Sequence, residues 1–177
     1  MILKLKRTPG IYLTGFMGCG KTTVGRMLAE KIGWRFVDID EDIETAQKTS
    51  ISSLFETVGE AEFRRIEAEA IRRRVLKVQA GHPMVVALGG GTFTQPAIVE
   101  LLHNSGVTIW LDVAFAVVKR RVDMASHRPL ARDPQKFQEL FEARRVFYEK
   151  AEYHVPVAED NSRLALEHIL ELPIFHE

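Results

Sequence analysis

The sequence has one cysteine, no excess of charge of either sign and no long apolar run, and each absence excludes a class of protein. A lone cysteine, Cys19, cannot form an intramolecular disulfide, which favours a reducing compartment, so we expect a cytoplasmic protein. The 24 basic and 24 acidic side chains give a formal net charge of +0, which predicts no nucleic-acid or anionic membrane partner. No run reaches the roughly 18 apolar residues that a membrane span requires. Small molecules are therefore the expected partners.

The pattern of apolar residues predicts an α/β fold in a single domain over residues 1–177. The 177 residues are 46% hydrophobic, which is enough for one continuous core. Short runs rich in β-branched residues alternate with longer segments of helical periodicity, as in βα units with a parallel sheet. The expected strands are 11–14, 35–39, 84–88, 107–111 and 153–157. The expected helices are 21–32, a long charged region from 41 to 77, one begun by Pro96, one from 113 to 124, 135–150 and 162–170.

A glycine-rich motif between the first strand and the first helix predicts a nucleotide site. Residues 15–22 read GFMGCGKT, which fits glycine, four residues, glycine, lysine and serine or threonine. Such glycines let the backbone turn its N–H groups toward a polyphosphate at the positive end of a helix, so a turn without a ligand is the weaker interpretation. Lys21 is expected to reach the β- and γ-phosphates, and the Thr22 hydroxyl to bind Mg²⁺. The expected nucleotide-binding residues in and after this loop are Gly15, Met17, Gly18, Cys19, Gly20, Lys21, Thr22 and Thr23.

Polar residues and glycines follow other strands, where ligands bind in open α/β sheets. Asp38 and Asp40 would lie on one side of an extended chain and could serve a metal and a hydroxyl; a helix cap plus a solvated acid is the alternative. The triplet of Gly89, Gly90 and Gly91 favours close approach of a ligand over a simple turn. For Asp112, helix capping is favoured over a metal-binding acid.

Several other side chains are interpreted from pattern alone. Arginines between residues 60 and 77 are expected on a solvated helix face, paired with neighbouring glutamates. Arg128, beside Pro129 in a polar loop at about 125–133, could close over a γ-phosphate or simply face solvent. Cys19 is interpreted as a small filler rather than a catalytic thiol.

Taken together, these segments make the sequence similar to the shikimate kinase family from Ile11 to about Leu170. The family carries Asp-x-Asp after the second strand, Gly-Glu-x-Glu-Phe-Arg-x-x-Glu, a triple glycine, Arg-Pro-Leu and a later Arg-x-x-x-Tyr. These occur in order as Asp38 to Asp40, Gly59 to Glu67, Gly89 to Gly91, Arg128 to Leu130 and Arg144 to Tyr148. The resemblance implies a P-loop kinase of the nucleoside-monophosphate-kinase type, with three layers around a five-stranded parallel sheet. A substrate-binding segment at about 39–78 and a lid at about 125–133 would be insertions within the domain.

The resemblance also implies a role for each site residue. Asp40 would bind the shikimate hydroxyls and act in catalysis, Arg64 and Arg144 would hold the carboxylate, and the three glycines would line the pocket. Arginine forks suit carboxylates and an aspartate suits hydroxyls. Asp38 and Thr22 would hold Mg²⁺, Lys21 and Arg128 would bracket the transferring phosphoryl group, and Arg121 would contact the adenine side of ATP.

The sequence departs from the family at three places. Ala131 follows the Arg-Pro-Leu segment where leucine is common, and Val146 replaces the usual proline between Arg144 and Tyr148. Residues 157–162, VAEDNS, lack the family's adenine-loop pattern, so the contacts of that loop are left unassigned.

The resemblance implies ATP-dependent phosphorylation of the shikimate 3-hydroxyl, which we expect to be carried out by a monomer. A kinase for another polyol acid, such as gluconate or quinate, is the first alternative. A catalytically silent relative that binds nucleotide is the second, and it is disfavoured because Lys21, Thr22, Asp38, Asp40 and Arg128 are all present.

Overall fold

The computed structural model describes residues 10–125 and 133–176. The strands are β1 (Gly10–Thr14), β2 (Arg35–Asp38), β3 (Met84–Ala87), β4 (Val107–Val113) and β5 (Tyr153–Val157). The α-helices are α1 (Lys21–Ile32), α2 (Ile39–Gln47), α3 (Ile51–Gln79), α4 (Pro96–Ser105), α5 (Phe115–Met124), α6 (Pro134–Tyr148) and α7 (Ser162–Leu170). Short 3₁₀ turns, η1 (Thr92–Thr94) and η3 (Pro173–Phe175), complete the described elements.

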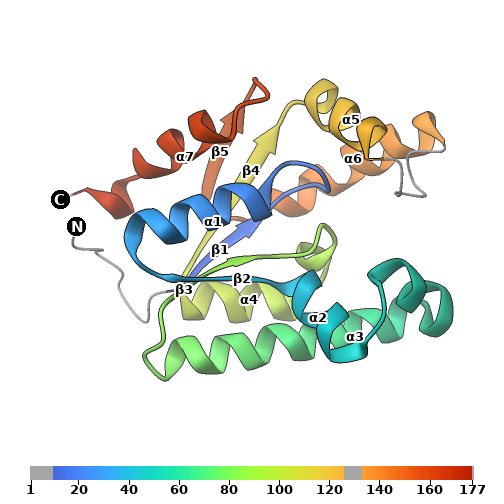
Figure 1. The fold of residues 1–177 in the computed structure, drawn as a ribbon, viewed down its shortest axis with the longest axis horizontal. Helices are drawn as coiled ribbons and strands as arrows, with labels where there is room; N and C mark the ends of the chain where they lie inside the picture. The colour runs from blue at the N-terminus through green and yellow to red at the C-terminus, as the bar shows by residue number, and fades with distance from the viewer. Residues whose placement is uncertain (1–9, 126–132, 177) are drawn as a thin grey trace.

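The five strands form one parallel sheet in the order β2-β3-β1-β4-β5 (Figure 1). Every residue of β1 and β3 is buried, as expected of central strands covered on both faces. The edge strands β2 and β5 alternate between buried and more exposed residues. The predicted α/β class with a five-stranded parallel sheet is therefore confirmed.

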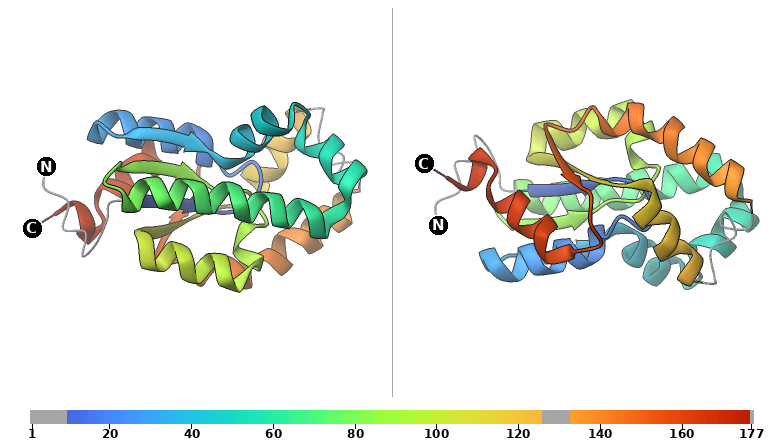
Figure 2. Two further views of the ribbon diagram at one scale, coloured as in Figure 1. Left: turned by 90° about the horizontal axis from the view of Figure 1, so that it is seen from below. Right: turned by 90° about the horizontal axis from the view of Figure 1, so that it is seen from above.

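Helices cover both faces of the sheet, so the molecule has three layers, with the sheet in the middle. Helices α1 and α7 lie on one face, and α3 and α4 lie on the other, as the views from below and above show (Figure 2). The first turn of α4 begins at Pro96, where the missing N–H of proline costs nothing, as predicted. No helix within residues 10–125 and 133–176 is long and apolar enough to cross a membrane.

Two predictions made at strand ends are wrong. Asp112 does not cap a helix: β4 continues to Val113, and Ala114 occupies the N-cap of α5 with no side-chain cap. The second strand ends at Asp38, because α2 begins at Ile39, so Asp38 and Asp40 do not share one side of an extended chain.

The long charged region divides into α2 and α3, and α3 is itself interrupted. Gly59 has φ 80° and ψ 172°, a conformation outside the helical region that favours glycine. Beyond it, Arg65 lies on the solvated face and pairs with Glu62 and Glu69, as predicted. Arg74 differs, because it is mostly buried and forms a bidentate ion pair with Asp42 of α2.

Candidate active site

The loop from Gly15 to Gly20 joins the carboxyl end of β1 to the first residue of α1. Gly18 and Gly20 have φ values of 77° and 93°, which residues other than glycine rarely adopt. A Cβ on Gly15 would lie 2.8 Å from the carbonyl oxygen of Leu111. Glycines are therefore required to close the loop tightly against the end of β4, and Cys19 is buried within it, consistent with a small filler.

Lys21 and Thr22 begin α1 and place two functional groups at the loop. The Lys21 ammonium donates to the carbonyl oxygens of Gly15 at 2.8 Å and Phe16 at 3.0 Å. The Thr22 hydroxyl donates to Oδ2 of Asp38 at 2.5 Å, across the gap between α1 and the end of β2. Asp38 also caps α2 by accepting from the backbone N–H of Asp40. The phosphate loop and the Asp38–Asp40 segment thus meet at one edge of the sheet.

Asp40 lies in the first turn of α2, in an environment that opposes its ionisation. Burial, followed by the charges of Asp38 and Glu67, raises the pKa of Asp40 from 3.8 to about 6, although the nearby charge of Lys21 acts in the opposite direction. The helix-cap alternative is correct for Asp38, but the second acid is not a solvated one. A carboxyl group with a raised pKa beside a phosphate loop is a candidate for a functional group.

Glu67, on α3, holds several neighbouring side chains of the site in place, and its own side chain is only 1% exposed. Its Oε1 accepts from Arg64 Nη1 at 2.9 Å and from Gln95 Nε2 at 2.8 Å, and its Oε2 accepts from Thr92 Oγ1 at 2.9 Å. A buried carboxylate satisfied by a charge and two polar groups is held rigidly. The guanidinium of Arg64 is therefore fixed in direction, and Arg64 does not lie on the solvated face on which the helical pattern placed it.

Two glycines of the triplet after β3, Gly89 and Gly91, are packed so closely that a side chain would not fit without a shift of its neighbours. A Cβ on Gly91 would lie 2.1 Å from Arg64 Nη2, and one on Gly89 would lie 2.6 Å from Glu67 Oε2 and 3.2 Å from Asp40 Oδ1. Arg64 Nε is buried and has no hydrogen-bond partner among the described residues. Glycine here lets the guanidinium approach the backbone while leaving a donor unused.

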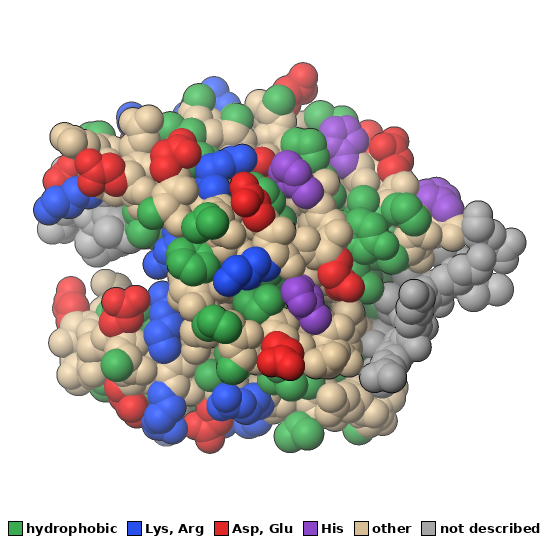
Figure 3. Space-filling view, turned by 180° about the vertical axis from the view of Figure 1, so that it is seen from behind, with side chains coloured by type: hydrophobic (Ala, Val, Ile, Leu, Met, Phe, Trp, Pro, Cys, Tyr) green, Lys and Arg blue, Asp and Glu red, His purple; other side chains and the backbone are tan. Residues whose placement is uncertain are grey.

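Helix α6 contributes two side chains to the same triplet. Arg144 Nη1 donates to the Gly90 carbonyl oxygen at 2.8 Å, and the Tyr148 hydroxyl donates to the same oxygen at 2.6 Å. On the other side, a Cβ on Gly90 would lie 3.4 Å from the backbone nitrogen of Met17. The triplet therefore touches the phosphate loop, α3 and α6. The molecule is hollowed between the α3 and α6 ends, and Lys and Arg side chains line that hollow (Figure 3).

Arg121 of α5 links the phosphate loop to the segment after β5. Its Nη1 donates to the carbonyl oxygen of Gly18 at 3.0 Å, while Nε and Nη2 donate to Oδ1 of Asp160 at 2.8 and 2.5 Å. Hydrogen bonding from Arg121 lowers the pKa of Asp160. Asp160 lies in the segment whose contacts the sequence left unassigned.

Most of the predicted site residues lie at this edge of the sheet. Thr23 follows Thr22 in the first turn of α1 and is exposed. Arg128, with most of the predicted lid, lies outside the described residues. Sequence reasoning missed Glu67, Thr92 and Gln95 as individual site residues. Glu67 lies within the Gly59–Glu67 motif and Thr92 directly follows the triplet, so motif position was the available signal; Gln95 had none.

Comparisons with known proteins agree with one another. A family model described as shikimate kinase matches residues 17–172. A shikimate kinase from Synechococcus sp. strain CC9605 is 40% identical over 173 residues, covering 94% of this chain and 84% of the relative. One from Persephonella marina is 39% identical over 146 residues, covering 82% and 87%. The solved structure of the Acinetobacter baumannii shikimate kinase in complex with shikimate is 34% identical, with a TM-score of 0.82 over 92% of this chain and 91% of that one. The fold and the site geometry agree with these matches, and the chain belongs to the shikimate kinase family.

Proposed function

We propose that this chain transfers the γ-phosphoryl group of ATP to the 3-hydroxyl of shikimate, giving shikimate 3-phosphate and ADP. We also propose which of its residues bind the acceptor, the nucleotide and the metal ion. One observation carries those roles: Arg64 and Arg144 reach the glycine triplet from different helices, and the triplet also touches the phosphate loop. Two guanidinium groups suit the carboxylate of the acid, because each presents a planar fork of donors. The Arg64 Nε, which has no hydrogen-bond partner among the described residues, is one such donor.

Asp40 is the group we assign to the reacting hydroxyl. It lies close to the triplet and close enough to Lys21 for the two charges to interact. The transition state of phosphoryl transfer is loose, so orientation of the hydroxyl matters more than base strength. Asp40 would orient the 3-hydroxyl for in-line attack and accept its proton late in the reaction.

Lys21 and Arg128 are the cations we assign to the transferring phosphoryl group. Lys21 would exchange its bonds to the loop carbonyl oxygens for bonds to the β- and γ-phosphates. Arg128 would neutralise charge from the other side. Arg121, held between Gly18 and Asp160, would face the adenine. We also propose that the chain acts as a monomer.

Thr22 and Asp38 fit a magnesium ion that accompanies ATP. Their oxygens lie 2.5 Å apart beside the phosphate loop, and Mg²⁺ prefers one or two hard protein oxygens together with phosphate oxygens. Thr22 would bind the ion directly and Asp38 through water. When bound, the ion would neutralise charge on the phosphates.

A coupled assay of ADP release with Mg²⁺ and ATP tests the proposal. Shikimate, quinate and gluconate are supplied separately, and the rate without an acceptor gives the background. We expect turnover well above that background with shikimate and the highest kcat/KM for shikimate among the three acids. A rate with shikimate no higher than background would refute the function, and a higher kcat/KM for quinate or gluconate would reassign the acceptor.

Arg144→Lys tests the carboxylate contact. Lysine keeps the charge but loses the planar fork, so the shikimate KM should rise about tenfold, the equivalent of one charge-assisted hydrogen bond. The ATP KM should change less than about twofold because Arg144 is not assigned to the nucleotide. Steady-state kinetics with each substrate varied in turn provides the measurement. An unchanged shikimate KM would remove Arg144 from the acceptor site.

A further inference from the structure

Asp112 is mostly buried beside the site but is used by neither the proposed nucleotide contacts nor the proposed acceptor contacts. Its two carboxylate oxygens accept from Arg145 Nη1 at 2.6 Å and from Arg145 Nη2 at 3.0 Å. His154 Nε2 lies 2.8 Å from Oδ2 of the same carboxylate. The Asp112 carboxylate on β4 is therefore held in place by three hydrogen bonds, two from Arg145 on α6 and one with His154 on β5.

Aromatic rings pack against this ion pair. The Arg145 guanidinium lies over the Trp110 ring at 4.9 Å from its centroid, and His154 stacks on Trp110 at 4.4 Å with an interplanar angle of 15°. The side chain of Asp112 is 13% exposed and that of Arg145 is 33% exposed. Limited contact with water strengthens the pair and makes its geometry well defined.

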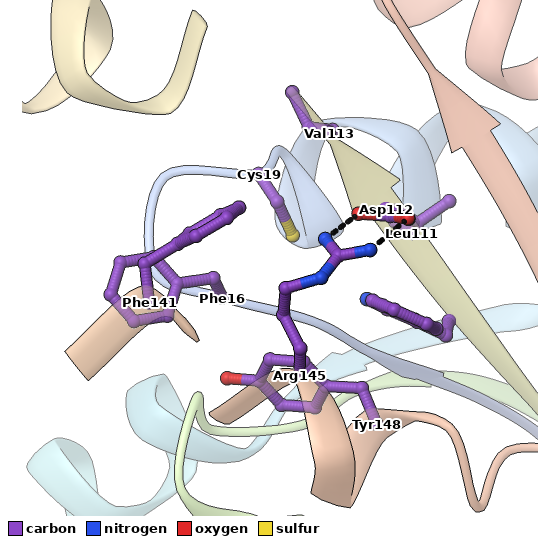
Figure 4. A pocket seen from close by; sticks show the side chains of 9 residues that line it. Phe16, Cys19, Leu111, Asp112, Val113, Phe141, Arg145 and Tyr148 are labelled. Atoms are coloured by element: carbon purple, nitrogen blue, oxygen red, sulfur yellow. Dashed lines mark hydrogen bonds and ion pairs between the residues drawn. The ribbon is translucent and has the colours of Figure 1, made fainter. Parts of the chain in front are cut away.

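Arg145 immediately follows Arg144, and this adjacency connects the ion pair to the acceptor site. Successive residues of an α-helix point about 100° apart, so Arg144 and Arg145 leave α6 in different directions. Arg144 and Tyr148 reach Gly90, whereas Arg145 reaches Asp112. Figure 4 shows the guanidinium of Arg145 directed at Asp112, with Tyr148 of the same helix beside it. Rotation of α6 that moved Arg144 away from Gly90 would have to break the Asp112–Arg145 pair.

We infer that Asp112 and Arg145 are positioning residues whose ion pair fixes the rotation of α6 and so aims Arg144 at the carboxylate of the acceptor. This inference rests on the proposed function. Neither Asp112 nor Arg145 needs to touch the acceptor or ATP for this effect.

Asp112→Asn, Arg145→Gln and the double variant test the inference by steady-state kinetics with each substrate varied. Each single variant should raise the shikimate KM about tenfold, with the ATP KM and kcat changed less than about threefold. The double variant should be no worse than the worse single variant, because both changes remove one interaction. Asp123→Asn is the matched control. Asp123 pairs with Lys119 at 2.9 Å within α5, both side chains are about half exposed, and loss of this pair should leave all constants unchanged.

The outcomes separate a positioning role from a purely structural one. An unchanged shikimate KM in folded single variants would overturn the inference. So would a parallel loss in kcat and in both KM values, because that pattern indicates general destabilisation. If the wild-type chain does not turn over shikimate, the proposed function fails on its own. The positioning role of the Asp112–Arg145 pair is then tested by NMR of the Arg144 guanidinium, whose signals are assigned by comparison with Arg144→Lys. These signals should shift in Asp112→Asn. Unchanged signals would overturn the inference.

Discussion

Asp40→Asn should abolish shikimate phosphorylation while making the folded protein more stable at neutral pH. The folded-state pKa of Asp40 is raised from 3.8 to about 6 by burial and by neighbouring acids. The folded protein therefore binds more protons than the unfolded chain between about pH 4 and pH 6, and its stability falls as pH rises through that window. Above pH 6 the ionised carboxylate costs about 3 kcal/mol, which asparagine removes. Turnover should fall at least ~100-fold because asparagine can still accept a hydrogen bond from the 3-hydroxyl but cannot take up its proton.

Thermal unfolding of the ligand-free protein at several pH values measures this gain. The Tm advantage of Asp40→Asn should be several degrees at pH 8 and should disappear near pH 4, where the wild-type carboxyl is protonated. Asp42→Asn, on the same helix, is the contrasting control. It breaks the bidentate pair with Arg74 and should lower stability by ~1–2 kcal/mol. Equal Tm values for wild type and Asp40→Asn at pH 8 would show that burial of the Asp40 charge carries no such cost.

Lys21→Met should reduce kcat by about 10³-fold or more. The methionine side chain fills a similar space but presents no charge to the phosphoryl group in the transition state, where preorganised cations act most strongly. The hydrogen bonds from Lys21 to Gly15 and Phe16 would also be lost, so the loop should bind ATP less tightly. Single-turnover measurement of phosphoryl transfer at saturating ATP separates the loss in chemistry from the loss in binding.

Lys31→Met is the matched control for that experiment. Lys31 lies exposed in the last turn of the same helix, far from the phosphate loop. Its replacement removes the same charge and should leave kcat within about twofold, at a stability cost of a few tenths of a kcal/mol from the helix dipole. Comparable losses in the two variants would mean that net charge, rather than the position of Lys21, governs the rate.

The elements that were correctly bounded from sequence carry strong local signals. Helix α1 was placed at 21–32, between a glycine loop and Gly33, which closes it in the left-handed conformation. Strand β5 and helix α7 were also placed at their observed bounds, and Asn161 caps α7 with its side chain. Such boundaries depend on residues within one turn of the boundary, so the sequence contains the information.

Asp112 shows where local reasoning fails. An aspartate before a helical segment is a good cap, and the pattern favoured that interpretation. The strand nevertheless continues through Asp112, because Arg145 and His154 supply the partners of its carboxylate. Those residues are 33 and 42 positions away along the chain. Pairing between residues so far apart along the chain produces no local or periodic pattern, so it cannot be predicted from a single sequence.

The acceptor half of the candidate site was similarly beyond pattern reasoning alone. Arg64 and Arg65 are adjacent and chemically identical, yet one is fixed by buried Glu67 and the other faces solvent with Glu62. Helical periodicity could not choose between them, because the break at Gly59 changes the direction of the chain within α3. Resemblance to a known family made the choice, and the geometry explains why it is physically reasonable.

The strand order β2-β3-β1-β4-β5 has a consequence for how acceptor choice could diversify. The proposed acceptor groups lie on α2, α3, α6 and the segment after β3, whereas the proposed nucleotide groups lie on the β1 loop, α1 and α5. Substitutions confined to 41–67 and 92–95, which spare Asp40 and the glycine triplet, could therefore redirect the enzyme to a new acid while the ATP machinery stays intact. A mutant library restricted to those positions should yield altered acceptor preference more often than loss of ATP binding, which makes this fold a favourable starting point for directed evolution.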